Sequence, residues 1–200
     1  MYSRRTGFVL GFHGCDKKIR DRIVSEKGFI LNPSENAYDW LGHGIYFWEN
    51  NHERALQFAI DLQTNPPKGK ENLIEEPAVL GAIIDLGFCL DLIDSKYLEA
   101  VKISYDTLCQ SHKNFGLDIP ENIKNEEGEL LRRNLDCAVI QSIHQMNKSL
   151  LKPEYDSVRG VFFEGPDLYE NAGFKEKNHI QIAIRNQNNI KGFFIPRELK

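Results

Sequence analysis

The 200-residue sequence has few cysteines, and their spacing does not mark a metal or disulfide site. The four are Cys15, Cys89, Cys109 and Cys137, and no two form a CxxC pair. Structural zinc sites need closely spaced Cys and His ligands, so neither zinc nor a disulfide framework is expected. The N-terminus also lacks a charged-then-apolar leader. Reduced thiols and a cytoplasmic location are therefore the expectation.

Long apolar runs and an excess of positive charge are missing too. No apolar run approaches the roughly 20 residues that a membrane-spanning helix needs, so no membrane partner is expected. The formal net charge of −4 gives no general attraction to nucleic acid or anionic lipid, although a local basic groove stays open. With 41% hydrophobic and 27% charged residues, the composition fits a single globular domain over residues 1–200.

Several familiar catalytic motifs are absent. The sequence contains no GxxxxGK[ST] phosphate loop, no GxGxxG after a strand, no HExxH and no GxSxG. The absence of HExxH and of His or Cys at metal-ligand spacing gives an expectation of no metal. Any chemistry must therefore come from a different arrangement of residues.

Hydrophobic periodicity predicts strands near both ends of the chain with helices between them, which is typical of an α+β fold. The predicted strands cover residues 7–15, 77–92 (broken near Gly87), 158–163, 180–184 and 190–195. The predicted helices are one capped by Asp16 that ends at Gly28, one over 95–108, and one from about 126 to 143.

The chain is organised around residues 41–50 and the helical pattern that follows them. Gly42 and Gly44 allow a tight backbone turn, and residues 45–48 form a β-branched and aromatic run typical of a strand. Residues 49–51 offer helix N-caps. The apolar positions of the next helix are Ala55, Phe58, Ala59 and Leu62. This stretch suits either a planar ligand or a tight turn before a core strand.

His13 and Tyr46 are the first two candidates for chemistry. His13 ends an apolar strand just before Gly14, so it is either a satisfied structural histidine or a group that hydrogen-bonds a ligand hydroxyl. Tyr46 lies inside its strand, where it is either a core side chain or a ring stacked on a flat heterocycle.

Gln181 and Glu164 are the other two candidates. Gln181 is the polar member of an apolar strand, so it is a buried amide that needs partners, a ligand contact, or part of an exposed edge. Glu164 follows a predicted strand and precedes Gly165. It is either a carboxylate for acid, base or electrostatic work or a solvated turn acid.

Together these pieces resemble the ADP-ribosyltransferase superfamily, in particular its poly(ADP-ribose) polymerase and diphtheria-toxin branch. Residues 12–14 (Phe-His-Gly) match its first motif, and residues 42–47 (Gly-His-Gly-Ile-Tyr-Phe), followed by 53–55, match the second. The strand 180–184 resembles the third. The resemblance implies a split β-sheet core with flanking helices, and it leaves residues 95–150 as a helical insertion.

The same resemblance implies NAD as a substrate. His13 would hydrogen-bond the adenosine ribose, the Gly14 backbone would anchor the nicotinamide carboxamide, and Tyr46 would stack on the nicotinamide ring. Gly44, Phe47 and Phe58 complete the implied cofactor-binding set. Nicotinamide would leave through an oxocarbenium-like transition state, and an acceptor nucleophile would attack the ribose carbon.

Two positions depart from the family pattern. The place of the family's catalytic glutamate falls on Gln181, which gives a His13-Tyr46-Gln181 triad. A neutral amide cannot stabilise a developing cation as a carboxylate does, so single transfer is favoured over chain elongation, with Glu164 as a candidate for the missing charge. Gln57, next to Phe58, stands where many relatives carry a second aromatic.

The leading hypothesis is mono-ADP-ribosyl transfer from NAD, a pentosyltransferase reaction, to an unknown acceptor: protein, nucleic acid or small molecule. One alternative is RNA 2′-phosphotransferase-like chemistry on a phosphorylated RNA end. Another is a non-catalytic module that binds NAD, ADP-ribose or a nucleotide, which the glutamine at position 181 supports. Small stand-alone members of this superfamily often act as toxins or defence effectors.

Overall fold

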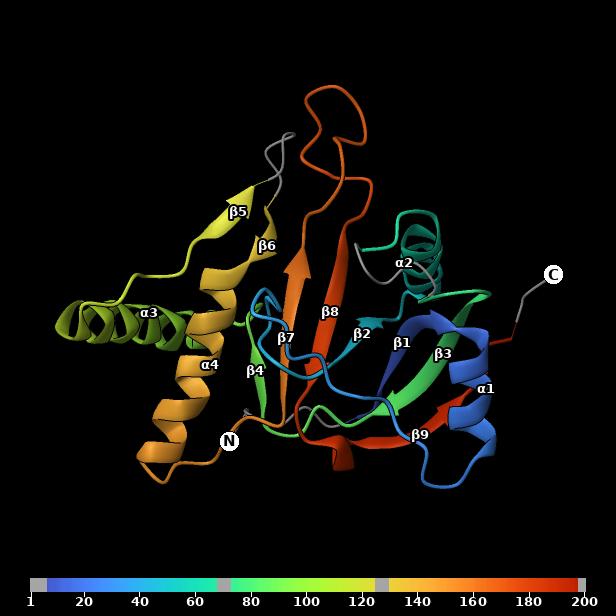
Figure 1. Cartoon of the computed structure of the whole chain (residues 1–200), viewed down its shortest axis with the longest axis horizontal. Helices are drawn as coiled ribbons and strands as arrows, with labels where there is room; N and C mark the ends of the chain where they lie inside the picture. Colours follow the sequence, from blue (N-terminus) through green and yellow to red (C-terminus); the bar gives the residue numbers. More distant parts are fainter. Residues whose placement is uncertain (1–6, 68–72, 125–129, 198–200) are drawn as a thin grey trace.

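The computed structural model describes residues 7–67, 73–124 and 130–197, which fold around one seven-stranded sheet (Figure 1). The strands of this sheet are β1 (Val9–Asp16), β2 (Ile45–Glu49), β3 (Pro77–Ile84), β4 (Cys89–Asp91), β7 (Ser157–Phe162), β8 (His179–Ile184) and β9 (Ile190–Phe194). Their spatial order is β4-β7-β8-β2-β1-β3-β9. Only the β4–β7 pair is parallel among these described strands.

Four helices and a small hairpin complete the described residues. The helices are α1 (Lys17–Ser25), α2 (His52–Thr64), α3 (Ser95–Phe115) and α4 (Asn134–Ser149), and a short 3-10 turn (Gln187–Asn189) precedes β9. The hairpin pairs β5 (Asn122–Lys124) with β6 (Leu130–Arg133). Helices α3 and α4 lie beside the β4 edge, and α1 and α2 lie near β1 and β3 (Figure 1). The mainly antiparallel sheet with helices confirms the α+β prediction.

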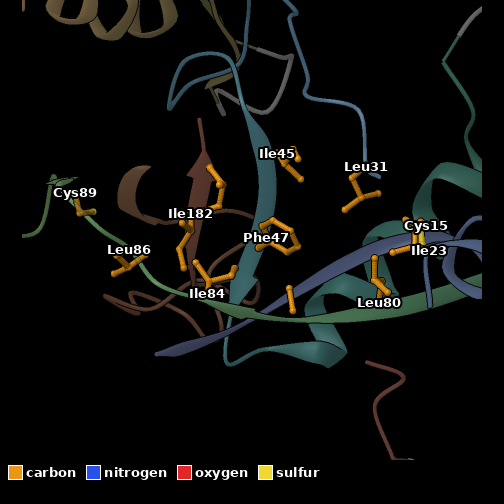
Figure 2. Packing of buried hydrophobic residues seen from close by; sticks show 12 residues of the cluster. Cys15, Ile23, Leu31, Ile45, Phe47, Leu80, Ile84, Leu86, Cys89 and Ile182 are labelled. Atoms are coloured by element: carbon orange, nitrogen blue, oxygen red, sulfur yellow. The ribbon is translucent and has the colours of Figure 1, made fainter. Parts of the chain in front are cut away.

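The sheet buries a large apolar cluster on the face that carries Phe47, which we call the Phe47 face (Figure 2). Its largest members, Ile45, Phe47, Leu80, Ile84 and Ile182, are at most 2% exposed. Because side chains alternate along a strand, Tyr46 and Trp48 point to the opposite side, which we call the Trp48 face. Gln181 shares that face because it pairs directly with Trp48.

Two helices cover the Trp48 face. Helix α2 lies over β1, where a Cβ on Gly14 would come within 2.0 Å of the Ala55 carbonyl oxygen. Only glycine therefore allows this close approach of helix and strand. Helix α4 contributes Ile140 and Ile143 to a second cluster, together with Leu90, Val158 and other buried residues.

Strand β1 is paired unequally on its two sides. It pairs with β3 over all eight of its residues, from Val9 to Asp16. With β2 it pairs at two positions among the described residues, Gly11 with Glu49 and Phe12 with Trp48. The two strands separate beyond Phe12. Residues 13–16 of β1 are therefore not paired with β2, and the separation begins within the first motif, residues 12–14.

The helix predicted from about residue 126 begins later, and this part of the prediction is wrong. Residues 125–129 lie outside the described part of the chain, and Leu130–Arg133 form strand β6. Helix α4 starts at Asn134 because the Asn122 side-chain oxygen accepts hydrogen bonds from the Leu135 and Asp136 amides. That cap comes from another element, which helical periodicity does not reveal.

The other predicted elements agree with the structure to within a few residues, apart from α3, which continues beyond the predicted end at 108 to Phe115. Gly87 breaks the apolar run between β3 and β4. Its φ of 58° explains why a glycine stands there, because other residues rarely adopt this conformation. No helix in residues 7–67, 73–124 and 130–197 has the length and apolar content to cross a membrane.

Candidate functional site

His13 lies in β1 where this strand separates from β2. Its Nδ1 is 2.8 Å from the Tyr46 carbonyl oxygen, so Nδ1–H donates and Nε2 carries the ring's lone pair. Burial lowers the pKa of His13, and the hydrogen bond to the carbonyl offsets only part of that effect. The ring is therefore neutral at pH 7. By strand alternation it stands on the Phe47 face, with its edge toward the Phe47 ring.

Tyr46 is held by the turn that precedes its own strand. Its hydroxyl donates to the Gly42 carbonyl at 2.8 Å and accepts from the Leu41 amide at 3.0 Å. Burial raises the pKa of Tyr46 far above its ordinary value, so the phenol stays protonated. The ring packs with Leu41 and Ala183, on the opposite side of the sheet from the His13 ring. Stacking on nicotinamide stays a prediction.

Gln181 is half-buried in β8, which lies between β7 and β2. The alternative of an exposed edge is therefore wrong. Its side-chain oxygen accepts a hydrogen bond from Trp40 Nε1–H at 2.8 Å. Gln181 and Tyr46 thus hold the same short stretch, residues 40–42, against the Trp48 face. We call it the 40–42 segment.

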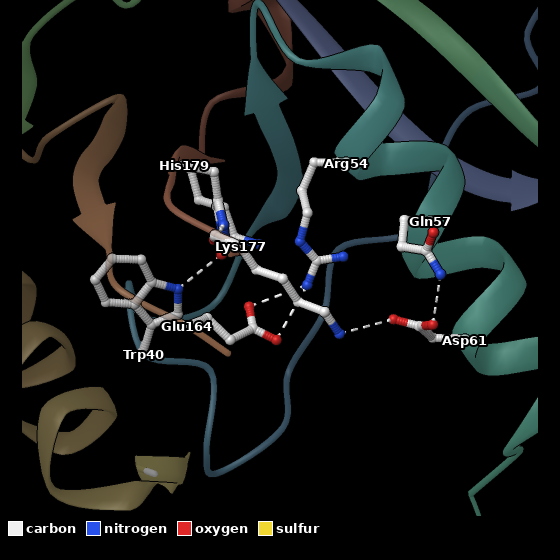
Figure 3. A network of polar contacts seen from close by, with 8 residues as sticks. Trp40, Arg54, Gln57, Asp61, Glu164, Lys177 and His179 are labelled. Atoms are coloured by element: carbon white, nitrogen blue, oxygen red, sulfur yellow. Dashed lines mark hydrogen bonds and ion pairs between the residues drawn. The ribbon is translucent and has the colours of Figure 1, made fainter. Parts of the chain in front are cut away.

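Glu164 forms an ion pair with Arg54, which stands in the first turn of α2 (Figure 3). Both carboxylate oxygens lie 3.0 Å from Arg54 Nη2. Arg54 is 9% exposed and the Glu164 side chain 27% exposed. The alternative of a solvated turn acid is therefore wrong. The positive charge of Arg54 offsets the negative charge of the Glu164 carboxylate.

A second ion pair also links α2 to the segment that connects β7 and β8. Lys177 lies 3.3 Å from Asp61, and Asp61 also accepts a hydrogen bond from Gln57. The connection between β7 and β8, residues 163–178, is therefore attached to α2 at both of its ends. It extends beyond the end of the sheet (Figure 1).

Aromatic rings and an arginine gather beside Gln181. Trp40 meets Phe162 edge to face with centroids 3.5 Å apart, and Phe162 stacks on His179 at 5.3 Å. The Arg133 guanidinium carbon lies 4.2 Å from the Phe162 centroid and 5.1 Å from the Trp40 ring. Such cation–aromatic contacts suit the binding of flat or charged ligands.

Sequence reasoning missed four residues of this region: Trp40, Arg54, Arg133 and His179. Two of them had a usable signal. Arg54 stands in the 53–55 part of the second motif, and strand alternation places His179 on the same face as Gln181. Trp40 and Arg133 come from segments that only the folded chain brings near β7 and β8.

The implied cofactor-binding residues mostly serve packing. Phe47 is completely buried in the Phe47-face core, so it serves packing in this structure, and its contact with a cofactor stays a prediction. Gly14 and Gly44 allow close backbone approach, since a Cβ on Gly44 would lie 2.8 Å from the Ile184 carbonyl oxygen. Phe58 is half-buried, with its ring centroid 4.9 Å from that of Trp48.

A cavity of about 400 Å³ lies between α3 and α4 and shares Trp40 and Arg133 with this region. Its walls are mainly apolar, including Leu98 and Val101, and its size is in the range of small-molecule sites. Among the described residues, no three His, Cys, Asp or Glu side chains lie together as metal ligands would.

The chain is similar to a curated protein named "Uncharacterized protein MJ0359", from Methanocaldococcus jannaschii. The two are 24% identical over 197 residues, which covers 90% of this chain and 83% of the relative. No family model and no solved structure matches the chain. The name of this relative states no activity.

Proposed function

We propose that this protein carries out NAD-dependent mono-ADP-ribosyl transfer to an acceptor of unknown identity. One observation carries the proposal: the His13–Tyr46 contact at the point where β1 and β2 separate. It joins the two sequence motifs of the resemblance across 33 residues. The parted strands support the split sheet that this family implies.

In this mechanism the bond between the ribose C1′ and the nicotinamide nitrogen breaks, and nicotinamide leaves with the bonding electrons. An acceptor nucleophile then attacks C1′ and gives up its proton. Neutral His13 offers Nε2 to a ribose hydroxyl on the Phe47 face. The Tyr46 ring lies on the opposite face, so its stacking on nicotinamide requires a donor that reaches both rings where β1 and β2 separate. Rate enhancement comes from orientation and preorganised polar contacts.

The 40–42 segment has to move for this chemistry. It is bonded to the Tyr46 hydroxyl and to the Gln181 side chain, the two groups that would face the donor. We therefore expect NAD to displace Trp40 from Gln181 on binding. The side-chain amide of Gln181 would then be free to hydrogen-bond a ribose hydroxyl.

A second candidate function is nucleotide binding without turnover. Two observations favour it: position 181 carries an amide, and the nearby carboxylate of Glu164 is engaged by Arg54 through both oxygens. With an amide at position 181 and Glu164 engaged by Arg54, a bound nucleotide would persist uncleaved. Chemistry on a phosphorylated RNA end stays as a third alternative.

The test is nicotinamide release from NAD by the purified protein, with Tyr46→Ala and Gln181→Glu alongside. The control is Tyr97→Ala, since Tyr97 is a buried tyrosine on α3 that contacts Tyr155. Transfer predicts release that falls at least about tenfold in Tyr46→Ala and persists in folded Tyr97→Ala. Release by Gln181→Glu alone would identify a binding module. No release by any variant and no NAD binding would reject both proposals and direct the assay to phosphorylated RNA ends.

A further inference from the structure

Four buried nitrogen atoms on the Trp48 face have no hydrogen-bond partner among the described residues. They are Trp48 Nε1, Arg54 Nε and Nη1, and His179 Nε2. Their residues come from β2, α2 and β8 and are 3%, 9% and 6% exposed. Buried polar groups in folded proteins are nearly always bonded, so four such atoms need an explanation.

The three side chains form one cluster. The Arg54 guanidinium carbon lies 5.8 Å from the Trp48 ring centroid, and the Trp48 and His179 centroids are 6.2 Å apart. Figure 3 shows His179, Arg54 and Glu164 in one view around Lys177. A single bound group of moderate size can therefore reach more than one of these nitrogens.

The chemistry of the four atoms defines what they can bind. Tryptophan and arginine nitrogens only donate, so three of the four require acceptor oxygens. His179 Nδ1 lies 2.6 Å from the Lys177 carbonyl oxygen and donates to it, which leaves Nε2 as an acceptor in the neutral ring. The two free nitrogens of Arg54 point in different directions, because guanidinium is a rigid fork. A group with several acceptor oxygens and one hydroxyl is required.

We propose that Trp48, Arg54 and His179 bind the phosphorylated ribose of a nucleotide. Phosphoryl oxygens accept from Arg54 and Trp48, and a ribose hydroxyl donates to His179 Nε2. Arg54 keeps its Nη2 contact with Glu164 throughout, since that nitrogen is separate from the two free ones. This site does not rest on the proposed function, because a phosphorylated ribose can be bound without being cleaved.

The connection 163–178 contacts this cluster through Glu164, which pairs with Arg54, and through Lys177, whose carbonyl accepts from His179. It is tied to α2 by Glu164–Arg54 and by Lys177–Asp61, and the second pair is well exposed, at 36% and 40%. Exposed ion pairs contribute little to stability, so this end can release at small cost. Release of Lys177 would also move the carbonyl that accepts from His179, and we expect this movement to give a ligand access to His179.

The experiment is isothermal titration of the full chain with ribose 5-phosphate, inorganic phosphate and adenosine. We expect ribose 5-phosphate to bind measurably and at least about tenfold more tightly than the other two probes. Arg54→Lys keeps a charge for Glu164 but removes the fork, and it should weaken binding about tenfold or more. Trp48→Phe keeps the ring and removes one donor, and it should weaken binding about three- to tenfold.

The matched control is Arg22→Lys, because the Arg22 guanidinium is paired with Glu26 at the surface of α1. Its affinity should equal that of the wild type. Equal binding by Arg54→Lys and Trp48→Phe overturns the proposal, as does equal affinity for inorganic phosphate. No binding of any probe, with ordered water at the four nitrogens in a crystal structure, also overturns it. The transfer proposal is tested by nicotinamide release, which is a separate measurement. Failure of the ribose-phosphate site in these titrations therefore does not decide the transfer proposal.

Discussion

Two buried arginines lie on opposite faces of the same sheet and differ in how they are bonded. Arg159 on β7 stands on the Phe47 face, where it bonds Glu49 through Nε and Nη2 and both Asp91 oxygens through Nη1. Arg54, which is nearly as buried, uses only Nη2 for hydrogen bonds from its side chain to the part of the chain that the structure describes, and its partner there is Glu164. The side chain of Arg159 is 7% exposed and that of Arg54 is 9% exposed.

The difference separates a structural arginine from one with binding capacity left over. All three Arg159 nitrogens are matched by the carboxylates of Asp91 on β4 and Glu49 on β2, so a ligand has nothing to add there. Arg54 retains two donors beside Trp48 and His179, two other side chains with unbonded nitrogens. Burial alone is therefore not the sign of a site; incomplete bonding of a buried charge is.

The largest effect on stability is expected at the completed cluster. Arg159→Met would remove the guanidinium that bonds the buried Glu49 and Asp91 carboxylates on the Phe47 face, which should lower the free energy of unfolding by about 3–5 kcal/mol. Urea denaturation followed by circular dichroism measures this change. A loss below 1 kcal/mol would contradict the assignment of Arg159 as a structural residue.

Acid should reveal another incompletely bonded group, His144 on α4. Neither of its ring nitrogens has a partner among the described residues, and burial, with a smaller contribution from Arg185, lowers its pKa to about 3. As the pH falls, His144 is protonated in the unfolded chain, where its pKa is near 6.5, before it is protonated in the folded protein. Stability is therefore lost as pH falls from about 6.5 toward 3, and His144 accounts for about 2 kcal/mol at pH 5.

The variant His144→Leu isolates this contribution. It removes the titrating group, so its stability should fall less than that of the wild type between pH 7 and pH 5. Urea titrations at both pH values give the comparison. An identical loss in the two proteins would show that His144 does not stay neutral in the folded state.

The smallest stability effect is expected at the incomplete cluster. Arg54→Met should cost only about 1 kcal/mol, because Glu164 can turn toward solvent and two unbonded donors disappear with the side chain. The same urea experiment as for Arg159→Met gives the contrast. Equal losses for the two variants would remove the distinction between the arginines.

Local patterns predicted most strands and the first helices, because alternation and caps act within a few residues. The caps at Asp16 and Asn51 are examples, and each accepts an amide from the first turn of its helix. The start of α4 was not predictable, since its cap, Asn122, lies on strand β5. Periodicity carries no information about such a partner.

The site was predictable only where a motif carried it. His13, Tyr46 and Gln181 were named as candidates from their positions in predicted strands and then from the resemblance, but the contacts of Gln181 and Glu164 were not predicted. Gln181 bonds Trp40 across 141 residues, and Arg54 bonds Glu164 across 110. These contacts depend on the order β7-β8-β2-β1, which no local pattern specifies.

The most direct test of the proposed function is the time course of nicotinamide release from NAD at equal concentrations of folded protein. The account predicts release by the wild type and by Tyr97→Ala, and a rate at least about tenfold lower for Tyr46→Ala. Equal rates for the wild type and Tyr46→Ala, or no release by the wild type, would contradict transfer at this site.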